Sequence, residues 1–284
     1  MVGPAAMGRA VEVMCERVGI SQRRACRLVG QSRATQRRFR CRSAGVEDRD
    51  RWLRGWLNEF AHVPRNRRKG YRRAWADLRS EGHVVNRKKV QRLWREEGLR
   101  VQRRQRRKRT GCSTVSVRPV AEGPNQVWGI DFQFDSTADG QQFKIASMVD
   151  EYTRESILNI VDRSITANKL TTELAAVIDQ RGRPGVLRCD NGPEFISETL
   201  RTFCAETAMG ISYIPPGEPW CNGYAESFNS RVRDECLNAN QFHSLLEARV
   251  VIGDYKTDYN QYHRHSSLGY LTPNEYAQQP TNQT

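Results

Sequence analysis

Three carboxylates stand in local sequences that could bring them to one site: Asp131, Asp190 and Glu226. Asp131 lies in the middle of an apolar alternating stretch, where an unpaired charge is costly and must have a partner. Asp190 ends a short apolar stretch, and the ligand sites of open sheets collect at the carboxyl ends of their strands. Carboxylate oxygens are hard ligands that suit magnesium or manganese. Two such ions can activate an attacking oxygen and stabilise the leaving one.

Each carboxylate also has a simpler structural explanation when it is taken alone. Asp131 could face solvent from its strand, and Asp190 could form an Asx turn, because Asp-Asn-Gly-Pro is favourable turn chemistry. Glu226 could be an ordinary first-turn glutamate that the helix dipole stabilises. The combination is more specific, since 35 residues separate Asp190 from Glu226 and Arg233 follows two helical turns later. Arg233 is expected to share the face of Glu226 and to contact a phosphate there.

The elements that must position these carboxylates are expected between residues 123 and 284. Three successive strands, over 127–134, 143–149 and 156–161, predict an antiparallel meander whose first strand has one buried face. Helices are expected over 165–180, 196–209, 223–237 and 245–262, with short strands over 186–189 and 211–214. The order β-β-β-α-β-α-β-α predicts an α/β fold class, an α+β mixed sheet of RNase H-like order with helices on its faces.

A helical, helix-turn-helix-like domain is expected over residues 1–45. Ser21 can cap a first helix and Gly30 can end it. Ser32 then opens a second short helix, which is basic because it carries Arg33, Arg37, Arg38 and Arg40.

A second helix-turn-helix domain is expected over residues 46–100. One helix follows Gly70, a turn spans residues 81–83, and Asn86 caps the next helix, whose apolar side is Val90, Leu93 and Trp94. A helix-turn-helix places its second helix in the major groove of DNA. The basic residues of that helix are therefore candidate DNA contacts, with a solvated helical hairpin as the alternative: Arg87, Lys88, Lys89, Arg92 and Arg95.

The charge of the chain is divided between its two parts. Residues 1–110 carry 32 Lys and Arg and 10 Asp and Glu, a net charge of +22. Residues 111–284 carry 14 Lys and Arg and 22 Asp and Glu, a net charge of −8, and the two parts together give the net charge of +14. A basic part suits a polyanion such as DNA, because neutralised phosphates release counterions. The segment 101–122 is expected to be a basic linker. The acidic part fits a DNA enzyme if some of its carboxylates hold metal ions.

Three motifs resemble those of the DDE transposase and retroviral integrase superfamily. They are Trp-Gly-Ile-Asp-Phe over 128–132, Asp-Asn-Gly-Pro-Glu-Phe over 190–195, and the stretch 220–229 around Glu226. A further motif is the tail over 259–273. The tail, with residues 21–39 and 70–99, is similar to the second-frame product of the insertion-sequence-3 family. The tail departs in having His-Arg-His over 263–265, where the family more often has Arg-Pro-His. Unlike retroviral integrases, the chain has no His-His-Cys-Cys zinc module.

The resemblance implies a transposase that cleaves DNA at the ends of a bacterial insertion sequence and transfers the freed strand. It implies that Asp131, Asp190 and Glu226 are catalytic and hold two Mg²⁺ (or Mn²⁺) ions, with Arg233, Asn222 and Asn191 as DNA contacts or supports of the ligands. Capping and turn formation are equally good explanations for the two asparagines. The implied partners are double-stranded DNA, as element ends and target, further copies of the chain, and the upstream-frame helix-turn-helix protein or a fusion to it.

Two other functions are compatible with parts of the sequence. A non-enzymatic DNA-binding regulator would need only the basic part, and the complete carboxylate triad argues against it. An RNase H-like nuclease would cut without joining strands, and the helix-turn-helix patterns favour recognition of duplex ends over general cutting. No apolar run is long enough for a membrane span, so a cytoplasmic, nucleoid-associated protein is expected.

Overall fold

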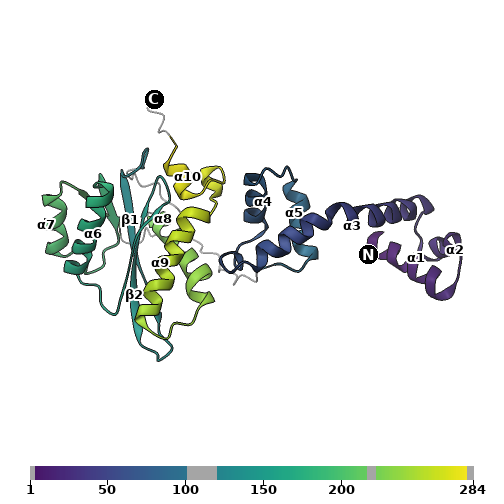
Figure 1. Cartoon of the computed structure of the whole chain (residues 1–284), viewed down its shortest axis with the longest axis horizontal. Helices are drawn as coiled ribbons and strands as arrows, with labels where there is room; N and C mark the ends of the chain where they lie inside the picture. The colour runs from purple at the N-terminus through teal and green to yellow at the C-terminus, as the bar shows by residue number, and fades with distance from the viewer. Residues whose placement is uncertain (1–3, 101–119, 216–221, 280–284) are drawn as a thin grey trace. The chain divides into compact units, whose positions relative to one another are not determined.

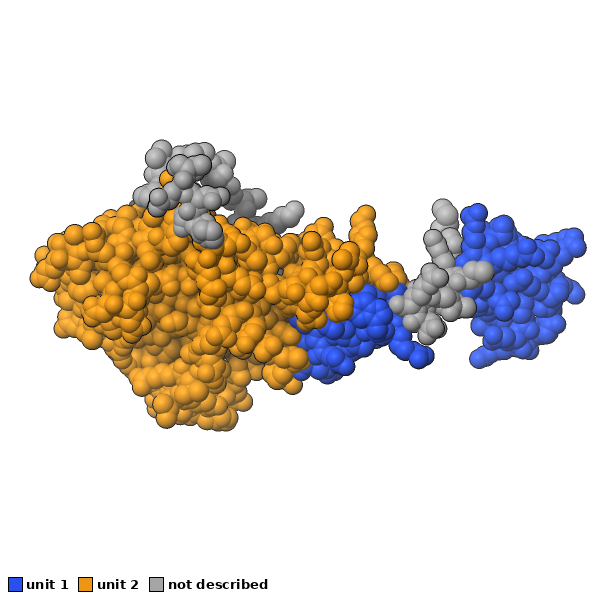
Figure 2. All heavy atoms as spheres, turned by 45° about the horizontal axis from the view of Figure 1, so that its top comes forward, with its two compact units in different colours: residues 1–62, 93–99 blue, residues 63–92, 100–284 orange. Residues whose placement is uncertain are grey.

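A computed structural model describes residues 4–100, 120–215 and 222–279 of the chain. They divide into two compact units, one of residues 1–62 and 93–99 and the other of residues 63–92 and 100–284 (Figure 2). Of the basic linker expected over 101–122, residues 101–119 lie outside the described part, as do residues 220 and 221 of the third motif.

The first unit contains α1 (Pro4–Val18), α2 (Gln22–Val29) and α3 (Arg33–His62), together with the end of α5 (Arg87–Glu96). As expected, the side chain of Ser21 caps α2, and Gly30 ends it with a φ of 71°. The expectation of a short second helix after Ser32 is wrong, because α3 is 30 residues long. It runs through the domain boundary that was expected between residues 45 and 46. No proline interrupts this stretch, and α3 ends just before Val63, whose position ahead of Pro64 disfavours helix.

The second helix-turn-helix pattern corresponds to α4 (Tyr71–Ser80) and α5 (Arg87–Glu96). The indole of Trp75 donates to the carbonyl of Val85 at 2.8 Å, and the Asn86 side chain caps α5 by accepting from the Lys88 amide at 2.8 Å. The expected apolar side, Val90, Leu93 and Trp94, is buried. The basic side is exposed at Arg87, Lys88, Arg92 and Arg95 and partly buried at Lys89.

The second unit contains a five-stranded mixed sheet in the order β3-β2-β1-β4-β5. The expected meander is present, with β1 (Val127–Ser136), β2 (Gln142–Asp150) and β3 (Ser156–Asp162) paired antiparallel. The short strands β4 (Val186–Cys189) and β5 (Gly210–Tyr213) continue the sheet in parallel from β1. This topology confirms the RNase H-like order that the pattern of elements predicts.

Helices cover both faces of this sheet (Figure 1). On one face lie α6 (Ala167–Arg181) and α7 (Glu198–Glu206), and on the other lie α8 (Gly223–Arg231) and α9 (Leu245–Tyr262). The expectation of a single buried face on β1 is wrong at its first residues, where Val127 to Ile130 are all buried. An added Cβ at Gly129 would lie only 3.2 Å from a carboxylate oxygen of Glu151 and 3.3 Å from the amide oxygen of Asn222, so the absent side chain lets these groups pack against β1.

The helix expected over 223–237 changes its winding before it ends. Its α-helical part stops at Arg231, and a π-helical turn, η3 (Val232–Cys236), follows, then a 3₁₀ turn, η4 (Leu237–Ala239). Such π-turns inside helices are frequent at functional sites. Glu235 in this turn accepts from Arg73 of α4 at 2.7 Å.

The C-terminal tail contacts α4 within the second unit. The guanidinium of Arg264 donates to Asp77 at 2.6 Å, and the rings of Tyr270 and Trp75 meet edge to face at 5.3 Å. A further short helix, α10 (Pro273–Ala277), begins with a capping box between Thr272 and Glu275. The tail thus joins α4 to the rest of the second unit. No described helix has both the length and the apolar character to cross a membrane.

Candidate active site

Asp131 lies on β1 at an open pocket, partly buried. One carboxylate oxygen accepts from the amide of Asn229 at 3.0 Å, and the other accepts from the backbone amide of Phe132 at 2.9 Å. Burial raises the pKa of Asp131 to about 6, and the charges of Asp190 and Glu226 add to this rise against the two hydrogen bonds. The partner expected for this charge is therefore a pair of amide donors, which compensates it only in part.

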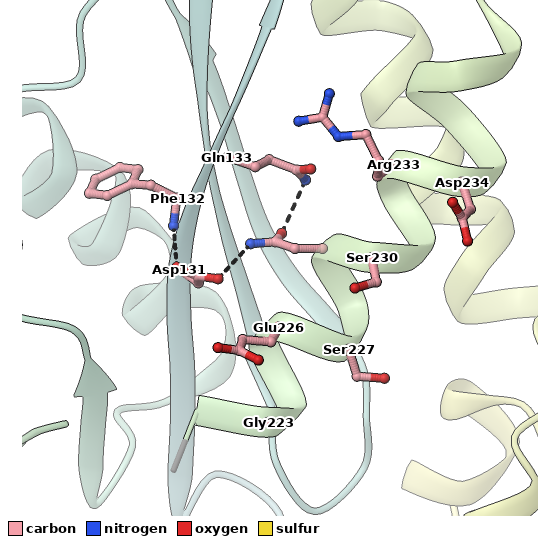
Figure 3. A pocket seen from close by; sticks show the side chains of 10 residues that line it. Asp131, Phe132, Gln133, Gly223, Glu226, Ser227, Ser230, Arg233 and Asp234 are labelled. Carbon is pink, nitrogen blue, oxygen red and sulfur yellow. Dashed lines mark hydrogen bonds between the residues drawn. The ribbon is translucent and has the colours of Figure 1, made fainter. Parts of the chain in front are cut away.

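The pocket brings Asp131, Glu226 and Arg233 to one space of about 750 Å³ (Figure 3). Glu226 lies in the first turn of α8, and its carboxylate points toward β1 and Asp131. The guanidinium of Arg233 donates to the carbonyl of Phe134 and lies 3.5 Å from the carboxylate of Asp135. Arg233 and Glu226 thus border one pocket, as their spacing in the sequence predicts, although Arg233 lies in the π-helical turn η3 and not in α8.

Asp190 approaches this pocket from the neighbouring strand but does not line it. The parallel register pairs Gly129 with Arg188, so the chain leaves β4 with Asp190 near Asp131. Its carboxylate accepts from the Gly192 amide at 2.9 Å, which is the Asx turn that the sequence allowed. Among the described residues, no group of three or more His, Cys, Asp or Glu side chains is already arranged to hold a metal ion. The three carboxylates are close enough to interact electrostatically, but they do not surround a common metal position.

Asn229 and Gln133 are the two site residues that sequence reasoning missed. The amide of Gln133 donates to Asn229 at 3.1 Å, and Asn229 in turn donates to Asp131, so the orientation of the Asn229 amide is fixed (Figure 3). The available signal was spacing, because Asn229 follows Glu226 by three residues and therefore shares its helical face.

The two candidate asparagines form hydrogen bonds inside the protein. Asn222 is only 2% exposed, makes no capping hydrogen bond, and donates to the carbonyl of Ile130 at 3.1 Å. It ties the start of α8 to β1 beside Asp131. Asn191 donates to the carbonyl of Ile214 at 2.8 Å and closes the turn after β4. Both side-chain amides therefore support the elements that carry the carboxylates.

Replacing Asp131 by Asn is expected to stabilise the metal-free protein at pH 8. Because the folded-state pKa is raised to about 6, the stability tied to this group is present below about pH 4 and is lost as the pH rises through 6. Loss of the Phe132 hydrogen bond offsets part of the gain, leaving about 1 kcal/mol. Thermal unfolding of the variant and the wild type in EDTA, at pH 8 and at pH 4.5, measures this difference in stability. A gain of equal size at both pH values would contradict the electrostatic explanation.

Parts of the chain match known protein families. Residues 121–219 and 207–273 match integrase core domain families, and residues 58–108 match an HTH-like domain family. A solved structure of the HTLV-2 integrase catalytic core domain in complex with magnesium aligns with 55% of this chain and 97% of its own, at a TM-score of 0.43 and 19% identity.

Proteins of insertion elements are similar over nearly the whole chain. The uncharacterized 31.7 kDa protein of insertion element IS407 from Burkholderia multivorans is 40% identical over 263 residues, which is 92% of either chain. The uncharacterized 39.2 kDa protein of IS476 from Xanthomonas euvesicatoria is 37% identical, over 97% of this chain and 78% of its own. Transposase InsF for insertion sequence IS3A of Escherichia coli is 27% identical, over 74% of this chain and 76% of its own. The chain belongs to the insertion-sequence-3 family of transposases, polynucleotidyl transferases that cleave and transfer DNA with an integrase core domain.

Proposed function

We propose that this transposase cuts and joins DNA at the ends of its insertion sequence with Asp131, Asp190 and Glu226 holding two divalent ions, Mg²⁺ or Mn²⁺. The observation that carries the proposal is the raised pKa of the Asp131 carboxyl group. Its pKa is raised by burial and then by the charges of Asp190 and Glu226, and none of the groups that chiefly shift it is a cation. Hard oxygen ligands with uncompensated charge suit these ions.

The carboxylates need only local movement to become ligands. Asp131 and Asp190 are held by amide hydrogens rather than by cations, and a carboxylate oxygen that accepts one such bond keeps a second lone pair for a metal. Asn229 and Gln133 hold the Asp131 carboxylate, and Asn222 fixes the start of the helix that carries Glu226. Divalent ions at these carboxylates would lower the barrier by stabilising charge on the attacking and leaving oxygens. Arg233 at the pocket edge would contact a neighbouring phosphate.

The DNA partner is expected to be double-stranded, as element ends and as target. The basic side of α5 would hold it through Arg87, Lys88, Lys89, Arg92 and Arg95. We propose that copies of the chain assemble to pair two ends, and that the upstream-frame helix-turn-helix protein, separate or fused, contributes to recognition of the ends.

A strand-transfer assay on the element's own end duplex separates the proposed function from its two rivals. The wild-type chain with Mg²⁺ is expected to yield both cleaved and joined strands, and EDTA should remove both. Cleavage without joining would indicate a nuclease. Binding without either reaction, repeated with the fused upstream frame, would indicate a regulator.

Replacing Lys88 and Arg95 by Gln together is expected to weaken duplex binding and to make it less dependent on salt. Each exposed cation that contacts a phosphate contributes about 0.9 to the slope of log K against log salt, so the slope should fall by nearly 2. Fluorescence anisotropy over a salt series measures this slope. Arg201→Gln, an exposed residue of α7, is the matched control and should leave the slope unchanged. An unchanged slope in the double variant would exclude this helix from phosphate contact.

A further inference from the structure

A second cavity adjoins the N-terminal half of α8, next to the candidate active-site pocket. Its volume is about 510 Å³, and both cavities are lined by Gly223 and Ser227. Its other walls come from the turn between β2 and β3 and from the C-terminal tail, with the ring of Tyr259 in its lining. At most the width of one helix therefore separates the two cavities.

Two buried polar atoms at this cavity have no hydrogen-bond partner among the described residues, Nη1 of Arg154 and Nε2 of His265. The guanidinium of Arg154 lies 3.6 Å from the centre of the Tyr224 ring. Arg154 also has a φ of 64°, an uncommon backbone conformation for a residue other than glycine. A charged donor that is buried without an acceptor is costly, so the arrangement points to an acceptor from outside the chain.

Positive charge exceeds negative charge around this cavity. The charged side chains that act on His265 are Arg231, Arg73 and Arg154, with Glu235 as the opposing carboxylate. Glu235 is already bonded to Arg73 at 2.7 Å and lies 3.9 Å from Arg231. Burial, followed by the three arginines, lowers the pKa of His265 to about 3, so its ring is neutral and Nε2 can carry a hydrogen for donation. An anion would compensate this excess.

We infer that this cavity is a subsite for a backbone phosphate of the DNA strand that the transposase holds in the adjoining active-site pocket. The inference rests on the proposed function. Arg154 and Arg231 supply the charge, His265 supplies a neutral donor, and the exposed hydroxyls of Ser266 and Ser267 supply further donors at the opening. A phosphate group needs several donors of this kind, and arginine matches its geometry well.

Single methylphosphonate substitutions in the end duplex test the subsite, since each makes one phosphate neutral. Binding is measured in EDTA, without catalysis. For the wild-type chain, we expect one phosphate near the cleavage position to contribute to binding. Neutralising that phosphate should weaken binding of the duplex about tenfold. Arg154→Gln should weaken binding of the normal duplex by a similar factor. Combining the two changes should cost no more than either alone, because they remove one contact. Additive losses, or no sensitive phosphate, would overturn the inference.

A second variant guards against a folding defect in Arg154→Gln. Ser267 is exposed at the cavity, so Ser267→Glu should fold normally and place a carboxylate where the phosphate would enter. It is expected to weaken binding at least as much as Arg154→Gln, whereas Ser267→Gln, its uncharged match, should have little effect. Equal behaviour of the Glu and Gln variants would count against an anion site.

Inorganic phosphate separates the possible sources of the anion and separates this inference from the proposed function. If phosphate alone raises the melting temperature of the wild-type chain but not of Arg154→Gln, and no DNA phosphate is sensitive, the cavity takes a free anion and the DNA assignment is wrong. A different outcome would be that binding in EDTA depends on one DNA phosphate but the wild-type chain with Mg²⁺ does not transfer strands. That outcome would count against the metal site and not against the subsite, because the phosphate contact is measured without metal.

Discussion

Replacing Glu226 by Gln is expected to reduce strand cleavage and joining on the order of a thousandfold or more, while leaving binding to the end duplex unchanged. The side chain lines the active-site pocket and adds to the charge that raises the pKa of Asp131. An amide keeps its size but loses the charge and one ligand oxygen, and a lost metal interaction removes several kcal/mol of stabilisation from the transition state. Single-turnover cleavage and joining, with anisotropy for binding, measure the two effects separately.

Asp234→Asn is the matched control for this prediction. Asp234 lines the same pocket, is exposed, and undergoes the same change from carboxylate to amide. Its activity should remain within a few-fold of the wild type. If both variants lose activity equally, the pocket needs negative charge in general. If Glu226→Gln retains activity, Glu226 is an ordinary first-turn glutamate and the triad is wrong.

Replacing Glu151 by Gln is expected to destabilise the catalytic unit by about 3 kcal/mol. Glu151 and Arg188 form an ion pair that is almost fully buried, with side chains 1% and 2% exposed and Nη1 of Arg188 at 2.7 and 2.6 Å from the two carboxylate oxygens. Without the carboxylate, the buried guanidinium loses the negative charge that it contacts through both oxygens. The midpoint of thermal unfolding should fall by about 6–12 °C.

Two further variants isolate the cause of this loss. Glu206→Gln changes an exposed glutamate of α7 and should leave the midpoint within about 1 °C. Replacing Glu151 and Arg188 together by Met should recover much of the stability, because an apolar pair of similar volume avoids the desolvation cost of the ions. A Glu151→Gln midpoint equal to the wild type would show that this pair contributes little.

Much of the catalytic unit could be predicted because its signals are local. The apolar alternation around Asp131 identified β1, and the apolar spacing between Leu245 and Tyr262 gave the bounds of α9 as the structure has them. The spacing from Glu226 to Arg233 placed both at one pocket. In these cases the period of the sequence and the geometry of one element decide the outcome.

Other features depend on contacts between distant segments. Glu151 and Arg188 are 37 residues apart, and each resembles an ordinary surface charge until the sheet brings them together. The hydrogen bond from Asn229 to Asp131 joins α8 to β1 across 98 residues. The long α3 was missed because a short basic helix after Ser32 and a separate domain from residue 46 were expected, whereas one helix spans Arg33–His62. The contacts of the tail with α4, through Arg264 and Tyr270, left no periodic signal.

Anomalous diffraction from crystals of the chain with end DNA and Mn²⁺ tests the central claim most directly. The account predicts anomalous density for two ions between the carboxylates of Asp131, Asp190 and Glu226, with Asn229 still bonded to Asp131. In crystals of Asp190→Asn, this density should weaken or vanish. Well-ordered DNA in the pocket with no anomalous density at these carboxylates, or with Mn²⁺ bound only elsewhere, would contradict the account.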